Sequence, residues 1–189
     1  MLVLPGVSAL SAFKNAKLLS SIQSQLPAVR ALNARFIHFA DCEDTLHAEE
    51  LDLLNALLDY GSASQSAVDT SALTAQLRVV VPRPGTISPW SSKATDIVHN
   101  CGLRKLRRIE RGIAYRIEAS APLSVAEIAV LDSLLHDRMT QAVLPDFDAA
   151  ISLFERAEPR PMSAVDILGR GEVALQEANT QMGLALADD

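Results

Sequence analysis

Aromatic residues make up only 4% of this 189-residue sequence, and basic residues are outnumbered, with 17 Lys and Arg against 23 Asp and Glu. Binding to nucleic acid depends on cations that neutralise phosphates and on rings that stack on bases, so we expect no nucleic-acid partner. Long apolar runs are missing as well: none approaches the roughly 20 residues that span a bilayer, so we expect no membrane partner. The apolar start has no basic flank and meets Pro5 and Gly6 at once, which predicts a strand and a turn rather than a signal peptide.

Cysteine is equally scarce. Cys42 and Cys101 are too few for a disulfide framework, and without a secretion signal we expect both to be reduced in the cytoplasm. The four histidines are scattered without metal-ligand spacing, and His99-Asn100-Cys101 is interpreted as a helix end before Gly102. The sequence lacks a nucleophile motif and a Gly-rich phosphate loop. We therefore predict no catalytic, cofactor-binding or metal-binding residue.

The sequence does contain an internal repeat. A shift of 77 residues superposes four segments in order, and it places Phe13 on Trp90, which we expect to be equivalent core anchors. The superposed segments are L-V-L-P (2–5) on V-V-V-P (79–82), Val29 and Leu32 on Leu106 and Ile109, F-I-H-F-A-D (36–41) on I-A-Y-R-I-E (113–118), and residues 45–58 on 122–135.

Each copy is predicted to have the order β-α-β-β-α-β. Short apolar runs that end at proline predict strands over 2–4 and 77–81. Ser8 and Ser88 are predicted helix N-caps, with Pro89 in the first turn of the second helix. The sequence Glu110-Arg111-Gly112 predicts a hairpin turn with solvated charges. The remaining predicted elements are strands 28–33, 35–41, 104–109, 112–119 and 142–144, a first-copy partner strand near 66–68, and Leu-lined helices ending near 58 and 135.

These elements predict an α+β fold of tandem duplicated ferredoxin-like modules. The predicted domains are a first repeat (1–76), a second repeat (77–145) and a partly helical linker (146–189). We expect residues 2–60 and 79–137 to be related by an approximate twofold axis, so that the pair mimics a symmetric dimer. In the linker, Phe147, Ala150, Ile151 and Phe154 predict a short amphipathic helix, and Ser163 with Asp166 predicts a capping box.

One segment, residues 82–103, holds the only Trp and an unusual number of hydroxyl groups. Three interpretations stay open: a capped helix with a buried Trp, a protein-docking surface, or an anion site at a helix N-terminus. The predicted interface residues are Arg83, Thr86, Ser88, Ser91, Ser92 and Lys93.

The same segment, P-R-P-G-T-I-S-P-W-S-S-K-A-T-D-I followed by H-N-C-G-L, resembles the N-terminal part of the large single-chain phosphoribosylformylglycinamidine synthases. Further motifs match the same family: S-A-L-S-A-F (8–13), H-F-A-D (38–41), E-R-G-I-A-Y (110–115), H-D-R-M-T (136–140) and G-L-A-L-A-D-D (183–189). The resemblance covers essentially the whole chain. It implies purine biosynthesis, in which formylglycinamide ribonucleotide, glutamine and ATP give formylglycinamidine ribonucleotide, glutamate, ADP and phosphate.

The resemblance also implies an arrangement of domains. The family has an N-terminal domain, a linker, a synthetase domain that uses ATP and Mg²⁺, and a C-terminal glutaminase domain. In split enzymes, the N-terminal domain corresponds to a small PurS-type subunit that dimerises. We expect this chain to be an excised, inactive scaffold whose partners are the synthetase and glutaminase domains of a cytoplasmic ligase. The alternative is a tandem regulatory module that binds a small metabolite between its copies.

Overall fold

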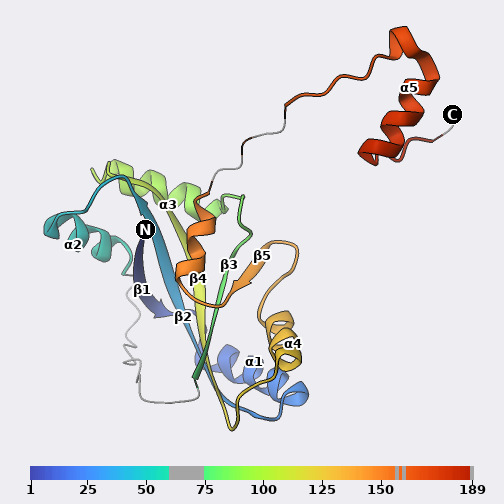
Figure 1. Cartoon of the computed structure of the whole chain (residues 1–189). Helices are drawn as coiled ribbons and strands as arrows, with labels where there is room; N and C mark the ends of the chain where they lie inside the picture. The colour runs from blue at the N-terminus through green and yellow to red at the C-terminus, as the bar shows by residue number, and fades with distance from the viewer. Residues whose placement is uncertain (60–74, 156–157, 159–160, 188–189) are drawn as a thin grey trace. The chain divides into compact units, whose positions relative to one another are not determined.

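The computed structural model describes residues 1–59, 75–155, 158 and 161–187, which belong to two compact units, Met1–Arg156 and Ala157–Asp189. The first unit is built on one antiparallel sheet with the strand order β1-β2-β4-β3-β5 (Figure 1). Its helices and strands confirm the expected α+β class. The strands are β1 (Leu2–Ser8), β2 (Val29–Cys42), β3 (Ala75–Pro82), β4 (Leu106–Ala119) and β5 (Gln141–Leu144).

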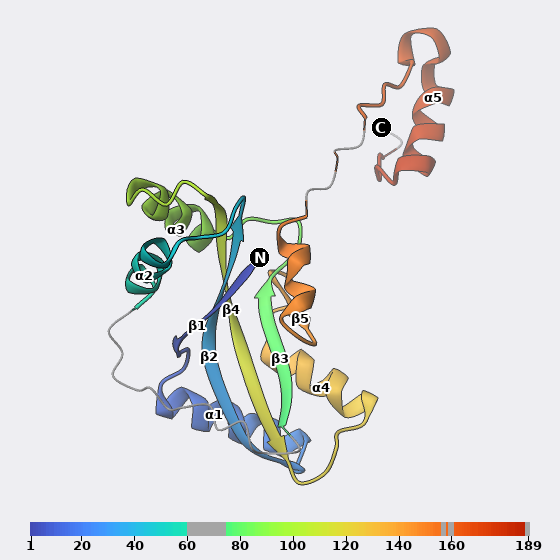
Figure 2. The same ribbon diagram turned by 60° about the vertical axis from the view of Figure 1, so that its left-hand side comes forward.

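Four helices pack on one face of the sheet, in two pairs at its two ends (Figure 2). Alternate residues of a strand point to the same face, so β2 supplies Leu32 to one apolar cluster and Ala40 to the other. Ile22 and Leu131 place α1 and α4 in the first cluster, and α2 and α3 belong to the second. The helices are α1 (Ala12–Gln25), α2 (Ala48–Leu57), α3 (Pro89–Asn100) and α4 (Val125–Leu135).

The opposite face of the sheet is covered by a short 3-10 helix, η1 (Asp148–Leu153). Ala150 and Leu153 pack with Phe39, Val79 and Val81, and Phe147 and Phe154 extend this third cluster. The amphipathic turn predicted from these spacings is confirmed. Ile151 is the exception among the residues predicted to form its apolar face, because its side chain is exposed.

Two local predictions are wrong. The expected hairpins do not form: β2 and β4 are continuous strands of 14 residues each, so residues 110–112 continue a strand instead of turning. Ser8 is not a helix cap either, because it lies in β1 and its hydroxyl donates to the Leu10 carbonyl. Ser11 caps α1 instead and accepts from the Lys14 N–H at 3.3 Å. The strand predicted near 66–68 lies outside the described residues.

Several features of the two halves recur at the predicted offset of 77 residues. The observed N-caps of α1 and α3, Ser11 and Ser88, differ by 77 positions. Glu50 and Glu127 also differ by 77 positions. Each accepts a hydrogen bond from the backbone N–H of the N-cap residue of its helix, α2 or α4. In the central antiparallel pair, Phe36 of β2 lies opposite Ile113 of β4. A twofold axis between duplicated halves needs such a pair at its centre. The duplication and its boundaries at 76 and 145 remain predictions.

Strands β1 and β3 and the predicted anchors do not follow that offset. Leu4 of β1 lies opposite His38, so it faces the helices, whereas Val81 of β3 packs in the cluster on the other face. The alignment of residues 2–5 with 79–82 is therefore wrong in register. Phe13 is 78% exposed, so its predicted role as a core anchor is also wrong.

The described residues of the second unit contain one helix, α5 (Ile167–Met182), which ends at Gly183 in the left-handed conformation. Asp166 is its N-cap and accepts from the Gly169 N–H at 2.8 Å, so the predicted capping box at Ser163 is wrong. Gly171 has a φ of 59° and kinks the helix, as expected for a residue without a Cβ. Ala174 and Ala178 are its buried residues.

Candidate functional site

The segment singled out in the sequence links the end of β3 to the first turn of α3. Ser88 is the N-cap as predicted, and its hydroxyl oxygen accepts from the Ser91 N–H at 3.0 Å. Pro89 occupies the first helical turn, where a missing N–H costs no hydrogen bond. Before the helix, Gly85 adopts a φ of 84° in the turn, a conformation that favours glycine.

A buried carboxylate lies at this helix start. Glu110 of β4 is buried, and its side chain accepts from the Ser88 hydroxyl at 2.5 Å, the Ser88 N–H at 3.3 Å and the Arg111 N–H at 3.2 Å. The prediction of a solvated Glu110 is therefore wrong, because the side chain is fully buried and hydrogen-bonded within the domain. Its position at the N-terminus of α3 suits a negative charge, because the helix dipole is positive there. The chain's own anion already occupies the position that an external anion would take. This arrangement disfavours the anion-site interpretation.

A second hydroxyl fixes α3 to the sheet. Ser91 is buried and donates to the Ile109 carbonyl at 2.6 Å, and the Thr95 hydroxyl accepts from the Ile109 N–H at 3.2 Å. Buried polar groups need such partners, so both contacts contribute to the position of the helix.

The six predicted interface residues thus divide into two sets. Ser88 and Ser91 use their hydroxyls inside the domain. The other four residues are exposed. Within the described residues, their side-chain hydrogen bonds are short-range: the Thr86 hydroxyl donates to the Arg83 carbonyl, and the Ser92 hydroxyl donates to the Ser88 carbonyl. The exposed set is Arg83, Thr86, Ser92 and Lys93.

Trp90 contributes to an aromatic and cationic stack between the two helix pairs. The Arg111 guanidinium lies 4.8 Å from the centre of the Trp90 ring and 4.4 Å from that of Phe36. The Trp90 ring also lies 5.6 Å from the ring of His38, which is buried. Sequence reasoning missed His38, Arg111 and Glu110 as partners of this segment. The motifs H-F-A-D and E-R-G-I-A-Y contain these three residues, but their shared location depends on strand register.

The environment of His38 disfavours its charged form. Burial lowers the pKa of His38 from 6.5 to about 4, against a backbone hydrogen bond with Leu4 that raises it, and the nearby Arg111 charge lowers it further. His38 is therefore neutral at physiological pH and acts as a packing partner for Trp90. A substituent at Gly6 would also meet this ring, since an added Cβ would lie 2.8 Å from a His38 ring carbon.

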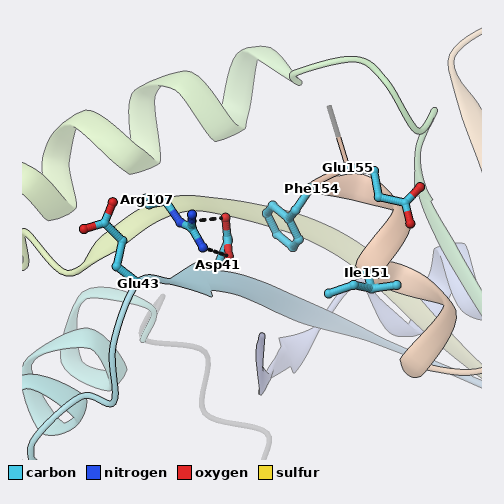
Figure 3. A pocket seen from close by; sticks show the side chains of 6 residues that line it. All are labelled: Asp41, Glu43, Arg107, Ile151, Phe154 and Glu155. Carbon is cyan, nitrogen blue, oxygen red and sulfur yellow. Dashed lines mark hydrogen bonds and ion pairs between the residues drawn. The ribbon is translucent and has the colours of Figure 1, made fainter. Parts of the chain in front are cut away.

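A separate pocket of about 540 Å³ lies where β2, β4 and the end of η1 meet (Figure 3). Its cation, Arg107, is already paired with Asp41 through bonds of 3.2 and 3.3 Å. The other charged residues lining it are Glu43 and Glu155. Within the described residues, no three His, Cys, Asp or Glu side chains are grouped closely enough to hold a metal ion.

Neither cysteine has the surroundings of a nucleophile. Burial raises the pKa of the Cys42 thiol, which disfavours the reactive thiolate. Cys101 is exposed at the end of α3, where the helix C-terminus provides no positive charge for a thiolate. In the part of the chain that the structure describes, no helix has the length and apolar character to cross a membrane.

Comparison with known protein families gives a match over most of the first unit. The family model described as formylglycinamide ribonucleotide amidotransferase N-terminal matches residues 35–154, well over half of the chain. The match begins at residue 35 within β2 and includes all of β3, β4 and the segment from Arg83 to Lys93.

Proposed function

Because the chain belongs to the formylglycinamide ribonucleotide amidotransferase N-terminal family, we propose that it is a non-catalytic scaffold domain of that enzyme of purine biosynthesis. Its partners are the synthetase and glutaminase domains of the same cytoplasmic ligase. ATP and Mg²⁺ are bound by the synthetase domain, not by this one. The domain keeps the other two in register and helps to enclose the route along which ammonia passes between them.

The observation that carries this proposal is the excess of exposed polar groups at the start of α3. Capping a helix needs one hydroxyl, and Ser88 supplies it. Arg83, Ser92 and Lys93 nevertheless remain on the surface around a segment that is fixed from below by Glu110 and Ser91. Exposed side chains on a rigid support are suited to contacts with another domain, because little conformational entropy is lost when the contact forms.

Ammonia supplies the physical reason for such a contact. Free ammonia is readily protonated and lost to water, so a closed route between glutaminase and synthetase raises the yield per glutamine. A loose scaffold would leak ammonia without destroying either active site. Glutamine-dependent synthesis should then fall while synthesis from added ammonia remains.

The test uses the complete amidotransferase that contains this domain. Arg83→Ala with Lys93→Ala should lower glutamine-dependent synthesis more than ammonia-dependent synthesis, with unchanged thermal unfolding of the domain. Lys17→Ala is the matched control, because Lys17 is also an exposed helical cation but lies on α1. Full glutamine-dependent activity in the double variant would contradict the proposal.

A further inference from the structure

Two turns that are far apart in the sequence, the one after β3 and the one before β5, lie side by side. β3 and β5 pair in antiparallel register, with Pro82 opposite Gln141. The pairing continues past the strand ends, since the Arg83 N–H donates to the Thr140 carbonyl at 3.1 Å. The turn from β3 to α3 therefore lies against the turn from α4 to β5, residues 136–140.

The side chains on these turns combine exposed apolar groups with cations. Ile87 is 60% exposed and Met139 is 79% exposed. Arg83 and Arg138 are exposed as well, and the structure shows no ion pair for either guanidinium among the described residues. We call these four residues, Arg83, Ile87, Arg138 and Met139, the two-turn surface.

Both turns are held in shape from within. The Thr86 hydroxyl and N–H both donate to the Arg83 carbonyl, at 2.6 and 3.1 Å. In the second turn the Asp137 carboxylate accepts from the Met139 N–H at 2.8 Å, and the Asp137 N–H donates to the Gln141 side chain at 2.9 Å. Asp137, the one acidic residue of the second turn, therefore has its carboxylate hydrogen-bonded to the backbone of that turn. The surface is presented in a fixed conformation.

From this combination we propose that the two-turn surface docks an acidic patch with an apolar centre on another domain of the same enzyme. This inference rests on the proposed function and extends it to a defined pair of turns. The partner's carboxylates pair with Arg83 and Arg138, and its apolar centre covers Ile87 and Met139. Charge complementarity supports this partner, because unpaired cations stand out on a chain with a net charge of −6.

A protein partner fits this surface better than a nucleic acid. Phosphates would satisfy the two guanidinium groups but would leave the two apolar side chains in water. The segment also offers no exposed aromatic ring for a base to stack on, since Trp90 packs against Arg111 and His38. Interface cores typically combine Met or aliphatic groups with Arg, as here.

The experiment is site-specific photo-crosslinking in the complete enzyme. A photoreactive amino acid replaces Met139, and in a matched control it replaces Val125, which is 85% exposed at the start of α4. We expect position 139 to crosslink to a peptide outside residues 1–189 and position 125 to give no such product. The double variant Arg83→Glu with Arg138→Glu should reduce the yield about tenfold, because each surface ion pair becomes a repulsion.

Arg104→Glu is the charge-matched control for each single reversal, Arg83→Glu or Arg138→Glu, since Arg104 is exposed on the segment between α3 and β4. Crosslinks confined to residues 1–189, equal products from position 125, or a yield insensitive to the charge reversal would overturn the inference. Activity measured on the same variants separates the two proposals. Crosslinking with unchanged activity would refute the ammonia role alone, and loss of activity without crosslinking from position 139 would refute this surface alone.

Discussion

The buried His38 makes the stability of this domain depend on pH in a predictable direction. Burial lowers the pKa of His38 from 6.5 to about 4, so the folded state stays neutral at a pH where the unfolded chain takes up a proton. The stabilisation is fully present above pH 6.5. It is lost as the pH falls through the interval from 6.5 to about 4, because the unfolded state then binds more protons than the folded state.

The size of the effect follows from these two pKa values. Lowering the pH from 7 to 5 should reduce the free energy of unfolding by about 2 kcal/mol through this one group. For a domain of this size, that corresponds to a decrease of about 4–8 °C in Tm. The chosen interval reaches only the upper edge of the range in which ordinary carboxylates titrate, and Asp132, whose pKa is raised by burial, is present in both proteins of the comparison below. Glu127, whose pKa is lowered by hydrogen bonds from the Ser124 side chain and backbone, therefore contributes little to the change.

The assay compares thermal unfolding of the 189-residue protein and His38→Gln at pH 7, 6 and 5 by circular dichroism. His47, His99 and His136 are present in both proteins, so their contributions cancel in the difference. We expect a smaller decrease in Tm for the variant, by about 4–8 °C, whatever its stability at pH 7. Parallel curves for the two proteins would refute the assignment of the pH dependence to His38.

Three further predictions concern the support of α3, the close packing of β4 and the thiols. In urea titrations, Glu110→Gln should lower the free energy of unfolding by about 2–3 kcal/mol and Ser88→Ala by about 1–2 kcal/mol. The double variant should lose less than the sum, because the two side chains share one hydrogen bond, and additive losses would contradict that link. Gly112→Ala should cost about 1–3 kcal/mol in the same titration, since its Cβ would lie 2.8 Å from a β3 carbonyl oxygen. Replacing Cys42 or Cys101 by Ser should leave glutamine-dependent synthesis by the complete enzyme unchanged, and a thiol-dependent loss would contradict the non-catalytic role.

Local chemistry explains what the sequence predicted well. The cap at Ser88, the proline after it and the helix end before Gly102 depend on neighbours within a few residues, and the structure has all three. The apolar spacing that predicted α2 and α4 is local in the same sense. Such local preferences predict the folded structure correctly because, in natural proteins, local preferences and tertiary contacts usually favour the same conformation.

The hairpin predicted at residues 110–112 failed for a non-local reason. A charged pair followed by glycine is typical of a turn, but here each residue serves a distant partner. Glu110 reaches Ser88, and Arg111 stacks between Trp90 and Phe36. Gly112 leaves room for the backbone of β3, which only the folded sheet brings near. Periodicity in one segment carries no information about such partners.

The differences between the two halves converge on the candidate site. At the offset of 77, Phe13 corresponds to Trp90, but the counterpart of Arg111 is Ala34, which has no cation to stack on a ring. Phe13 is consequently exposed while Trp90 packs. Likewise, Glu110, whose carboxylate accepts from Ser88, corresponds to Asn33 at this offset. Shared features, such as the N-caps, are those that any helix on this sheet needs, whereas the residues that differ support one exposed segment. If the halves arose by duplication, the second one acquired a buried anion and a cationic stack beneath residues 83–93, where the proposed docking role requires a rigid base.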